Sequence, residues 1–243
     1  MQTTNHSAPL EAAGAADLSE QDELSEQNEL NAWHTRLMAL AARAAALDGD
    51  GAHDANHIER VWRNARAIMI DHPEADRLVV LAACCLHDLV NLPKNDPARH
   101  LASTRSAELA RRELEALGFP RARLDAVAHA IAAHSFSAGI EPQTLEARIV
   151  QDADRLDGLG AVGLARMFYT AGRMGSSLAH GSDPLAAARP LDDKAYSLDH
   201  IPAKLAKLPG MMRTDAGRRL GEQRLALLET FRATFAAEWS GAD

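Results

Sequence analysis

Apolar residues recur at intervals of three and four along most of the chain beyond residue 30, which is the pattern of amphipathic helices. The run from Leu78 to Val90 is different, because apolar side chains lie on every side of it at helical spacing. It predicts a central helix buried all round that ends at the adjacent polar pair His87 and Asp88. No segment alternates with a convincing period of two, so the sequence predicts an all-α fold.

Helix boundaries follow from caps and breakers. The Gly-rich segment 48–51 ends the first helix. The segment 91–97, which contains Pro and Asn, cannot continue the apolar helix. A long stretch rich in Gly, Ser, Asp and Pro, residues 180–193, predicts a loop. The predicted helices span about residues 30–47, 54–70, 75–88, 106–118, 120–134, 142–156, 161–174, 200–208 and 214–239.

Charge is unevenly distributed along the 243 residues. The formal net charge is -8, but residues 1–30 carry seven acidic residues and no Lys or Arg. The remainder therefore holds 27 acidic residues against 26 basic ones, which argues against a nucleic-acid-binding surface. Residues 1–28 have a polar composition without an apolar face, so we expect a disordered acidic tail, with a frayed helix from residue 19 as the alternative. Residues 29–243 are expected to form a single domain.

Both cysteines, Cys84 and Cys85, lie in the apolar run. There they most simply act as small apolar residues in a reducing compartment, and zinc binding is not expected of them. No apolar run is long enough to span a membrane, and the N-terminus lacks the features of a signal peptide. We therefore expect a cytoplasmic protein without a membrane partner. The sequence leaves the oligomeric state open, a homodimer included.

Four residues have side chains of the kind that bind metals and lie on or beside predicted apolar faces: His57, His87, Asp88 and Asp154. A buried charge is costly unless it is paired or bound to a metal, so the His-Asp pair at the end of the apolar run requires an explanation. Two imidazoles and two carboxylates suit borderline divalent ions and leave room for water. These residues predict a metal site.

Asp154 is preferred to Asp152 as the fourth ligand because of its position on the predicted helix. Asp154 lies one turn after Val150 and so projects near the apolar face. Asp152 lies four residues after Arg148 and three before Arg155, the spacing of a solvated, ion-paired face.

The order His57, His87-Asp88, Asp154 on predicted helices resembles the HD-domain superfamily of metal-dependent phosphohydrolases. The segments 52–61, 86–94, 133–137 and 149–156 are similar to stand-alone bacterial HD hydrolases, a group that includes nucleotide pyrophosphohydrolases. The resemblance covers about residues 37–235. It implies an HD-domain helical bundle in which the four residues bind one divalent ion, Mn²⁺ above Mg²⁺, Co²⁺, Ni²⁺, Fe²⁺ or Zn²⁺. A metal-bound hydroxide would then attack phosphorus.

Two features of the sequence depart from related enzymes. Many HD nucleotidases carry Glu four residues after the ligand His, where this chain has Asn91. The general acid or base is therefore not carried over from the family. Members with two metals use two further histidines, but His129 and His134 diverge by about 140° on one helix. We therefore expect one metal, with His134 facing the site.

Further candidates surround the metal ligands. Lys94 lies on an irregular loop and is expected to bind a substrate phosphate, with a solvated surface lysine as the alternative. His134 is a candidate proton donor, or else a helix cap. Arg60 either binds phosphate or pairs with a carboxylate near the metal. Asp157 is expected to support a ligand rather than bind the ion. His53 precedes the predicted cap and is not expected to be a ligand.

The function expected from this reading is divalent-metal-dependent hydrolysis of nucleotides or related phosphorylated small molecules. Cleavage of nucleoside triphosphates to monophosphate and pyrophosphate is one candidate reaction. The competing class is a non-catalytic regulatory module that binds a nucleotide beside a structural ion. A third class is an oxygenase with a two-iron site, which needs more ligands than this sequence places.

Overall fold

The structure is a computed structural model that describes residues 10–48, 55–92 and 96–242. The expectation of an all-α fold is confirmed, because no described residue belongs to a β-strand apart from one isolated bridge between Ser177 and Tyr196. No helix among the described residues is long and apolar enough to cross a membrane. The α-helices are α1 Leu10–Asp48, α2 Ala55–Met69, α3 Arg77–Leu86, α4 Ala102–Ala116, α5 Leu124–His134, α6 Leu145–Asp157, α7 Gly160–Arg173, α8 His200–Ala203 and α9 Asp215–Ser240.

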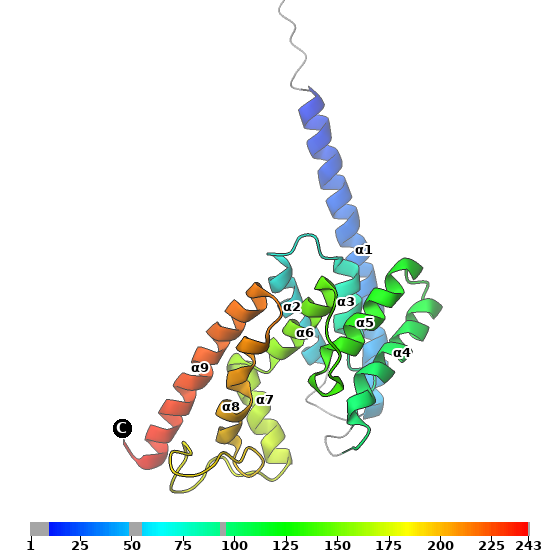
Figure 1. Cartoon of the computed structure of the whole chain (residues 1–243). Coiled ribbons are helices and arrows are strands. Elements are labelled where there is room, and N and C mark those ends of the chain that lie inside the picture. The colour runs from blue at the N-terminus through cyan, green and yellow to red at the C-terminus, as the bar shows by residue number, and fades with distance from the viewer. Residues whose placement is uncertain (1–9, 49–54, 93–95, 243) are drawn as a thin grey trace, which may run out of the picture.

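Helix α3 is the centre of the bundle (Figure 1). Every residue from Leu78 to Leu86 is buried, as the apolar run predicts. Helices α1, α2, α5 and α6 pack around it, so its apolar surface is covered on all sides. Asp76 caps its N-terminus by accepting hydrogen bonds from the backbone N–H groups of Leu78 and Val79. The helix is therefore a rigid support whose C-terminal end is fixed by its neighbours.

Helix α1 includes part of the segment expected to be a tail. The expected boundary at residue 28 falls inside a continuous helix that starts at Leu10, whose N-terminal part extends away from the other helices (Figure 1). The described side chains from Glu23 to Glu29 are exposed, and burial begins at Leu30. Packing against the core therefore starts where the apolar pattern starts, although helical backbone begins earlier. Asp48 is the last described residue of this helix, and the Gly-bearing segment that is predicted to end it lies outside the described residues.

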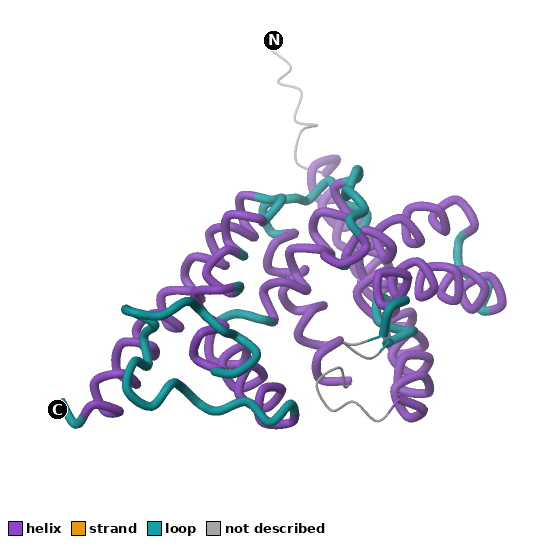
Figure 2. The backbone as a smooth tube through the Cα atoms, turned by 60° about the horizontal axis from the view of Figure 1, so that its bottom comes forward, coloured by secondary structure: helices purple, strands orange, loops and turns teal. Residues whose placement is uncertain are grey.

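The C-terminal part consists of α7, α8, α9 and the long connection between α7 and α8, which runs beside α9 (Figure 2). The side chain of Arg232 donates to the backbone oxygen of Leu185, and the indole of Trp239 donates to that of Gly181. Within the connection, Arg189 makes two hydrogen bonds to the buried carboxylate of Asp199. These contacts tie the connection to the last helix.

Asp152 is fully buried, so the expectation of a solvated, ion-paired side chain is wrong. Its carboxylate accepts hydrogen bonds from the backbone N–H groups of Arg213 and Thr214 and from the Thr214 hydroxyl. Burial raises the pKa of Asp152, and these hydrogen bonds oppose that rise. A Cβ added to Gly217 would lie 2.5 Å from a carboxylate oxygen, so glycine is needed for this close approach. Asp152 therefore anchors the start of α9 to α6.

Replacing Asp152 with Ala is expected to lower the free energy of unfolding by about 2–4 kcal/mol, because two buried N–H groups and a hydroxyl lose their acceptor. Chemical denaturation monitored by circular dichroism measures the loss. Asp125→Ala is the matched control, because Asp125 is a highly exposed partner of Arg111 and such pairs contribute little. Equal stability of the two variants would contradict the anchoring role.

Candidate metal centre

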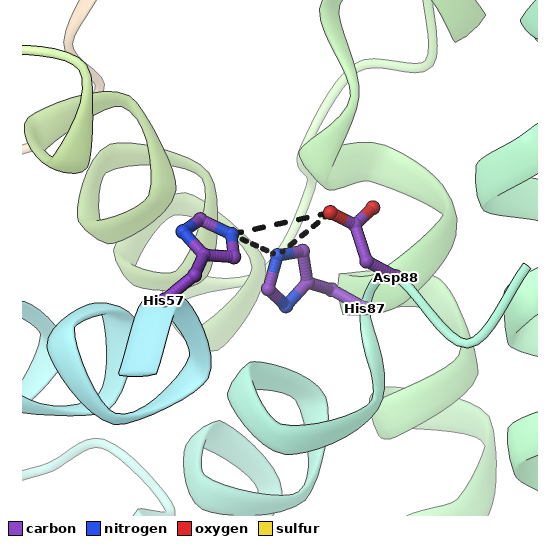
Figure 3. A group of neighbouring side chains, drawn as sticks. All are labelled: His57, His87 and Asp88. Atoms are coloured by element: carbon purple, nitrogen blue, oxygen red, sulfur yellow. Dashed lines mark hydrogen bonds and ion pairs between the residues drawn. The ribbon is translucent and has the colours of Figure 1, made fainter. Parts of the chain in front are cut away.

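The structure brings the four predicted metal ligands together from three helices. His57 lies in the first turn of α2, and Asp154 lies on α6. His87 immediately follows α3 with helical backbone angles, and Asp88 is the next residue. Figure 3 shows the imidazoles of His57 and His87 directed toward each other and toward the Asp88 carboxylate. Side chains from three separate stretches of the sequence therefore face a common point.

Hydrogen bonds fix the tautomers of both imidazoles. The Nδ1 of His57 is 2.7 Å from Asp157 Oδ2, and the Nδ1 of His87 is 2.8 Å from the backbone oxygen of Cys84. A carbonyl oxygen or an ionised carboxylate only accepts hydrogen bonds, so each Nδ1 carries the proton. A neutral imidazole has only one N–H, so in its neutral form each ring presents the lone pair of Nε2 to the site.

These two Nε2 atoms are 3.2 Å apart. Two lone pairs at this distance repel each other unless a proton or a cation lies between them. Burial lowers the pKa of His87 to about 4, which opposes a proton on that ring at neutral pH. Two metal–nitrogen bonds of about 2.1 Å, at angles between square and tetrahedral, place nitrogens about 3.0–3.4 Å apart. The observed separation therefore fits two ligands of one ion.

The carboxylates complete the set on the solvent side. Asp88 Oδ2 lies 3.5 Å from His87 Nε2, and Asp154 Oδ1 lies 3.6 Å from His57 Nε2 and 3.8 Å from His87 Nε2. The tightest group is His57, His87 and Asp88, and Asp154 is slightly more open. The two carboxylates are 25% and 29% exposed, whereas the imidazoles are at most 1% exposed. An ion here would be bound by the two nitrogens on its buried side and would be accessible to solvent on the side of the carboxylates.

His134 ends α5 and faces the site, as expected. Its Nδ1 donates to the backbone oxygen of Ile131 at 2.7 Å, and its Nε2 lies 3.5 Å from Asp88 Oδ1. Burial lowers the pKa of His134, but the hydrogen bond and negative charge of Asp88 outweigh that effect and raise it overall. The two oxygens of Asp88 therefore face different partners, one toward the metal ligands and one toward His134.

Asp157 is a buried carboxylate that supports His57 from behind. Besides the His57 Nδ1–H it accepts hydrogen bonds from Arg60, at 2.7 Å from Nε and 3.1 Å from a terminal nitrogen, and from Arg166. Burial raises the pKa of Asp157, yet the hydrogen bonds of His57 and Arg60 and the charge of Arg166 hold it well below its usual range. It therefore stays ionised and fixes the His57 ring.

This network gives Arg60 the second of its two expected roles, an ion pair with a carboxylate near the metal ligands. Arg166 had no signal in the sequence that linked it to the site. Gly163 explains its placement, because a Cβ there would lie 2.2 Å from backbone atoms of Gly158. Glycine lets α7 approach the end of α6 closely, which brings Arg166 to Asp157.

Three other candidates have different outcomes. Lys94 and His53 lie outside the described residues. His129 is directed elsewhere, because its Nε2 accepts a hydrogen bond from the backbone N–H of Gln143 at 3.0 Å. A second metal held by both His129 and His134 is therefore not supported by this geometry.

Comparison with known proteins agrees with this arrangement. The HD domain profile matches residues 54–159. Protein YpgQ of Bacillus subtilis strain 168, which is described as uncharacterized, is 32% identical over 206 residues, covering 83% of this chain and 88% of its own. The crystal structure of YpgQ in complex with ADP is similar with a TM-score of 0.66 and 27% identity, covering 86% of this chain and 96% of that one. An HD-superfamily hydrolase from Bacillus thuringiensis matches with a TM-score of 0.67 and 28% identity, over 87% and 98% of the two chains.

Replacing Asp157 with Asn is expected to weaken Mn²⁺ binding about 10- to 100-fold, because the neutral amide no longer fixes the orientation and basicity of His57. Isothermal titration calorimetry on metal-depleted protein measures the dissociation constant. Asp199→Asn is the matched control, since Asp199 is also a buried carboxylate bound to an arginine but contacts no metal ligand. An unchanged dissociation constant in folded Asp157→Asn protein would refute the supporting role.

Proposed function

The chain belongs to the HD-domain superfamily, and from this membership we propose that it is a divalent-metal-dependent phosphohydrolase acting on nucleotides or related phosphorylated small molecules. The observation that carries the proposal is the pair of imidazole Nε2 atoms 3.2 Å apart beside two partly exposed carboxylates. Mn²⁺ is the proposed ion, and this mixed set of nitrogen and oxygen ligands also suits the other borderline divalent ions. The complex of YpgQ with ADP supports a nucleotide as the ligand.

The proposed ion is held by His57, His87, Asp88 and Asp154. Bound there, a divalent ion supplies a polarised phosphoryl oxygen and a water of lowered pKa as the nucleophile. The protein's own side chains orient the substrate, exclude water and donate the proton. The buried imidazoles exclude water from one side, so a substrate phosphate can approach only from the side on which the carboxylates are exposed.

His134 is the proposed proton donor to the leaving oxygen. Asp88 favours the imidazolium form of His134, and the Nδ1 hydrogen bond to Ile131 directs Nε2 toward the site. The proton on Nε2 is then the one available for transfer. This assignment does not need a Glu at position 91, where the chain has Asn91.

Positive charge near the site supports binding of a phosphorylated substrate. Arg60 and Arg166 lie behind His57 and share Asp157, and both side chains are partly exposed. Asp157 offsets one of these two positive charges, so this group of three side chains keeps one net positive charge behind His57. Lys94 stays a candidate phosphate ligand on the strength of its sequence position six residues after Asp88.

The test is release of phosphate and pyrophosphate from a panel of nucleotides by metal-depleted protein reloaded with Mn²⁺, Mg²⁺, Co²⁺ or Ni²⁺. Turnover is expected with Mn²⁺, with pyrophosphate as the product from nucleoside triphosphates. Asp88→Ala is expected to lose the metal and the activity. His134→Gln is expected to keep the metal and to lower kcat by about 10²- to 10⁴-fold. Asp125→Ala, on the surface, serves as the control.

No turnover with any metal, together with binding of a nucleotide, would refute the enzyme and favour a non-catalytic regulatory module. Full metal retention by Asp88→Ala would instead refute the ligand assignment. The two results are distinguished by measuring metal content in the same samples.

A further inference from the structure

Phe136 is the most exposed aromatic side chain among the described residues. It is 76% exposed, whereas Tyr169 and Trp239 are 52% and 42% exposed. A phenyl ring gains stability from burial, so a ring left in water next to a functional site is a candidate contact for a ligand. Phe136 is close to the metal centre along the chain, because His134, which faces that centre, is only two positions earlier.

The backbone holds Phe136 in place without help from its ring. The chain leaves α5 at Ser135, whose backbone is extended, and forms the short 3-10 helix η3, Phe136–Ala138. Gly139 closes this turn with φ of 65°, a left-handed conformation that suits glycine, and its N–H donates to the backbone oxygen of Phe136. The hydroxyls of Ser135 and Ser137 are 3.0 Å apart and form a further hydrogen bond. The exposed ring is therefore presented by an ordered turn.

This turn lies beside the site. Two residues span at most about 7 Å, so the Cα of Phe136 is within that distance of the Cα of His134. The imidazole of His134 in turn reaches Asp88 at 3.5 Å. The turn also packs against the 3-10 helix η1, Arg99–Leu101, where Leu101 is 39% exposed. Two exposed apolar side chains, Phe136 and Leu101, thus lie on short helices that pack together, and one of these helices begins two residues after His134.

We propose that Phe136 is a stacking surface for the base of a nucleotide whose phosphates lie at the metal centre. This inference rests on the proposed function. It assigns a binding surface to the base, the part of the nucleotide that the metal ligands do not contact. Phosphates match the ion and the nearby cations, and a flat, weakly polar base matches an exposed phenyl ring. Stacking alone discriminates little between bases, because each presents a π-face, so broad base tolerance is expected.

The experiment compares binding of ADP with binding of inorganic pyrophosphate, which has the same number of phosphates and no base. Calorimetric titrations with Mn²⁺ present are carried out on wild type, Phe136→Ala and Phe136→Trp. Phe136→Ala is expected to weaken ADP binding roughly 5- to 150-fold and to leave pyrophosphate binding unchanged. Phe136→Trp is expected to retain ADP binding. Ile70→Ala, which removes another highly exposed apolar side chain at the far end of α2 from His57, is the control.

Equal loss of ADP and pyrophosphate binding in Phe136→Ala would show that the turn merely supports the site and would overturn the inference. Unchanged ADP binding in that variant, or no ADP binding by wild type, would overturn it as well. The readout is binding and not turnover, so it separates this inference from the proposed function. A protein that binds ADP through Phe136 but hydrolyses no nucleotide would keep the inference and lose the proposed reaction.

Discussion

The close approach of two imidazole nitrogens, each with its lone pair directed inward, is the constraint on which the rest of the structure depends. The Nε2 atoms of His57 and His87 are 3.2 Å apart, and the proton of each ring is held on the opposite nitrogen by an acceptor. In the neutral form of both rings, this arrangement favours a cation between the two nitrogens. The bundle holds the two rings in this position. The buried helix α3 fixes His87, and the buried carboxylate of Asp157 keeps the His57 ring from turning away.

Helix α6 connects the metal centre to the rest of the fold through three carboxylates. Asp152 and Asp154 differ by about 200° around the helix, so they project to opposite sides, and Asp157 lies about one turn beyond Asp154. The first anchors α9, the second faces the imidazoles, and the third supports His57. Stability and chemistry therefore share one short helix, and each of these three carboxylates has a separate environment and a separate role.

The sequence predicted those features that local pattern determines. The burial of α3 and the all-α class follow from the periodicity of apolar residues, and the structure has them. The convergence of His57, His87-Asp88 and Asp154 followed from residue chemistry together with resemblance to a family. Local spacing could not identify the partner of Asp152, because that partner lies about 60 residues away at the start of α9. The role of Arg166 was equally hidden, since it depends on a close contact between backbone atoms at Gly163 and Gly158.

The central claim is that a single divalent ion lies among His57, His87, Asp88 and Asp154. Its most direct test is a crystal structure of the Mn²⁺-loaded protein with diffraction data collected at the manganese absorption edge. The account predicts one strong anomalous peak between the two imidazole Nε2 atoms and the two carboxylates, with metal–ligand distances of about 2.0–2.3 Å. A peak at another place in the chain, or no peak at these four residues in fully loaded protein, would contradict it.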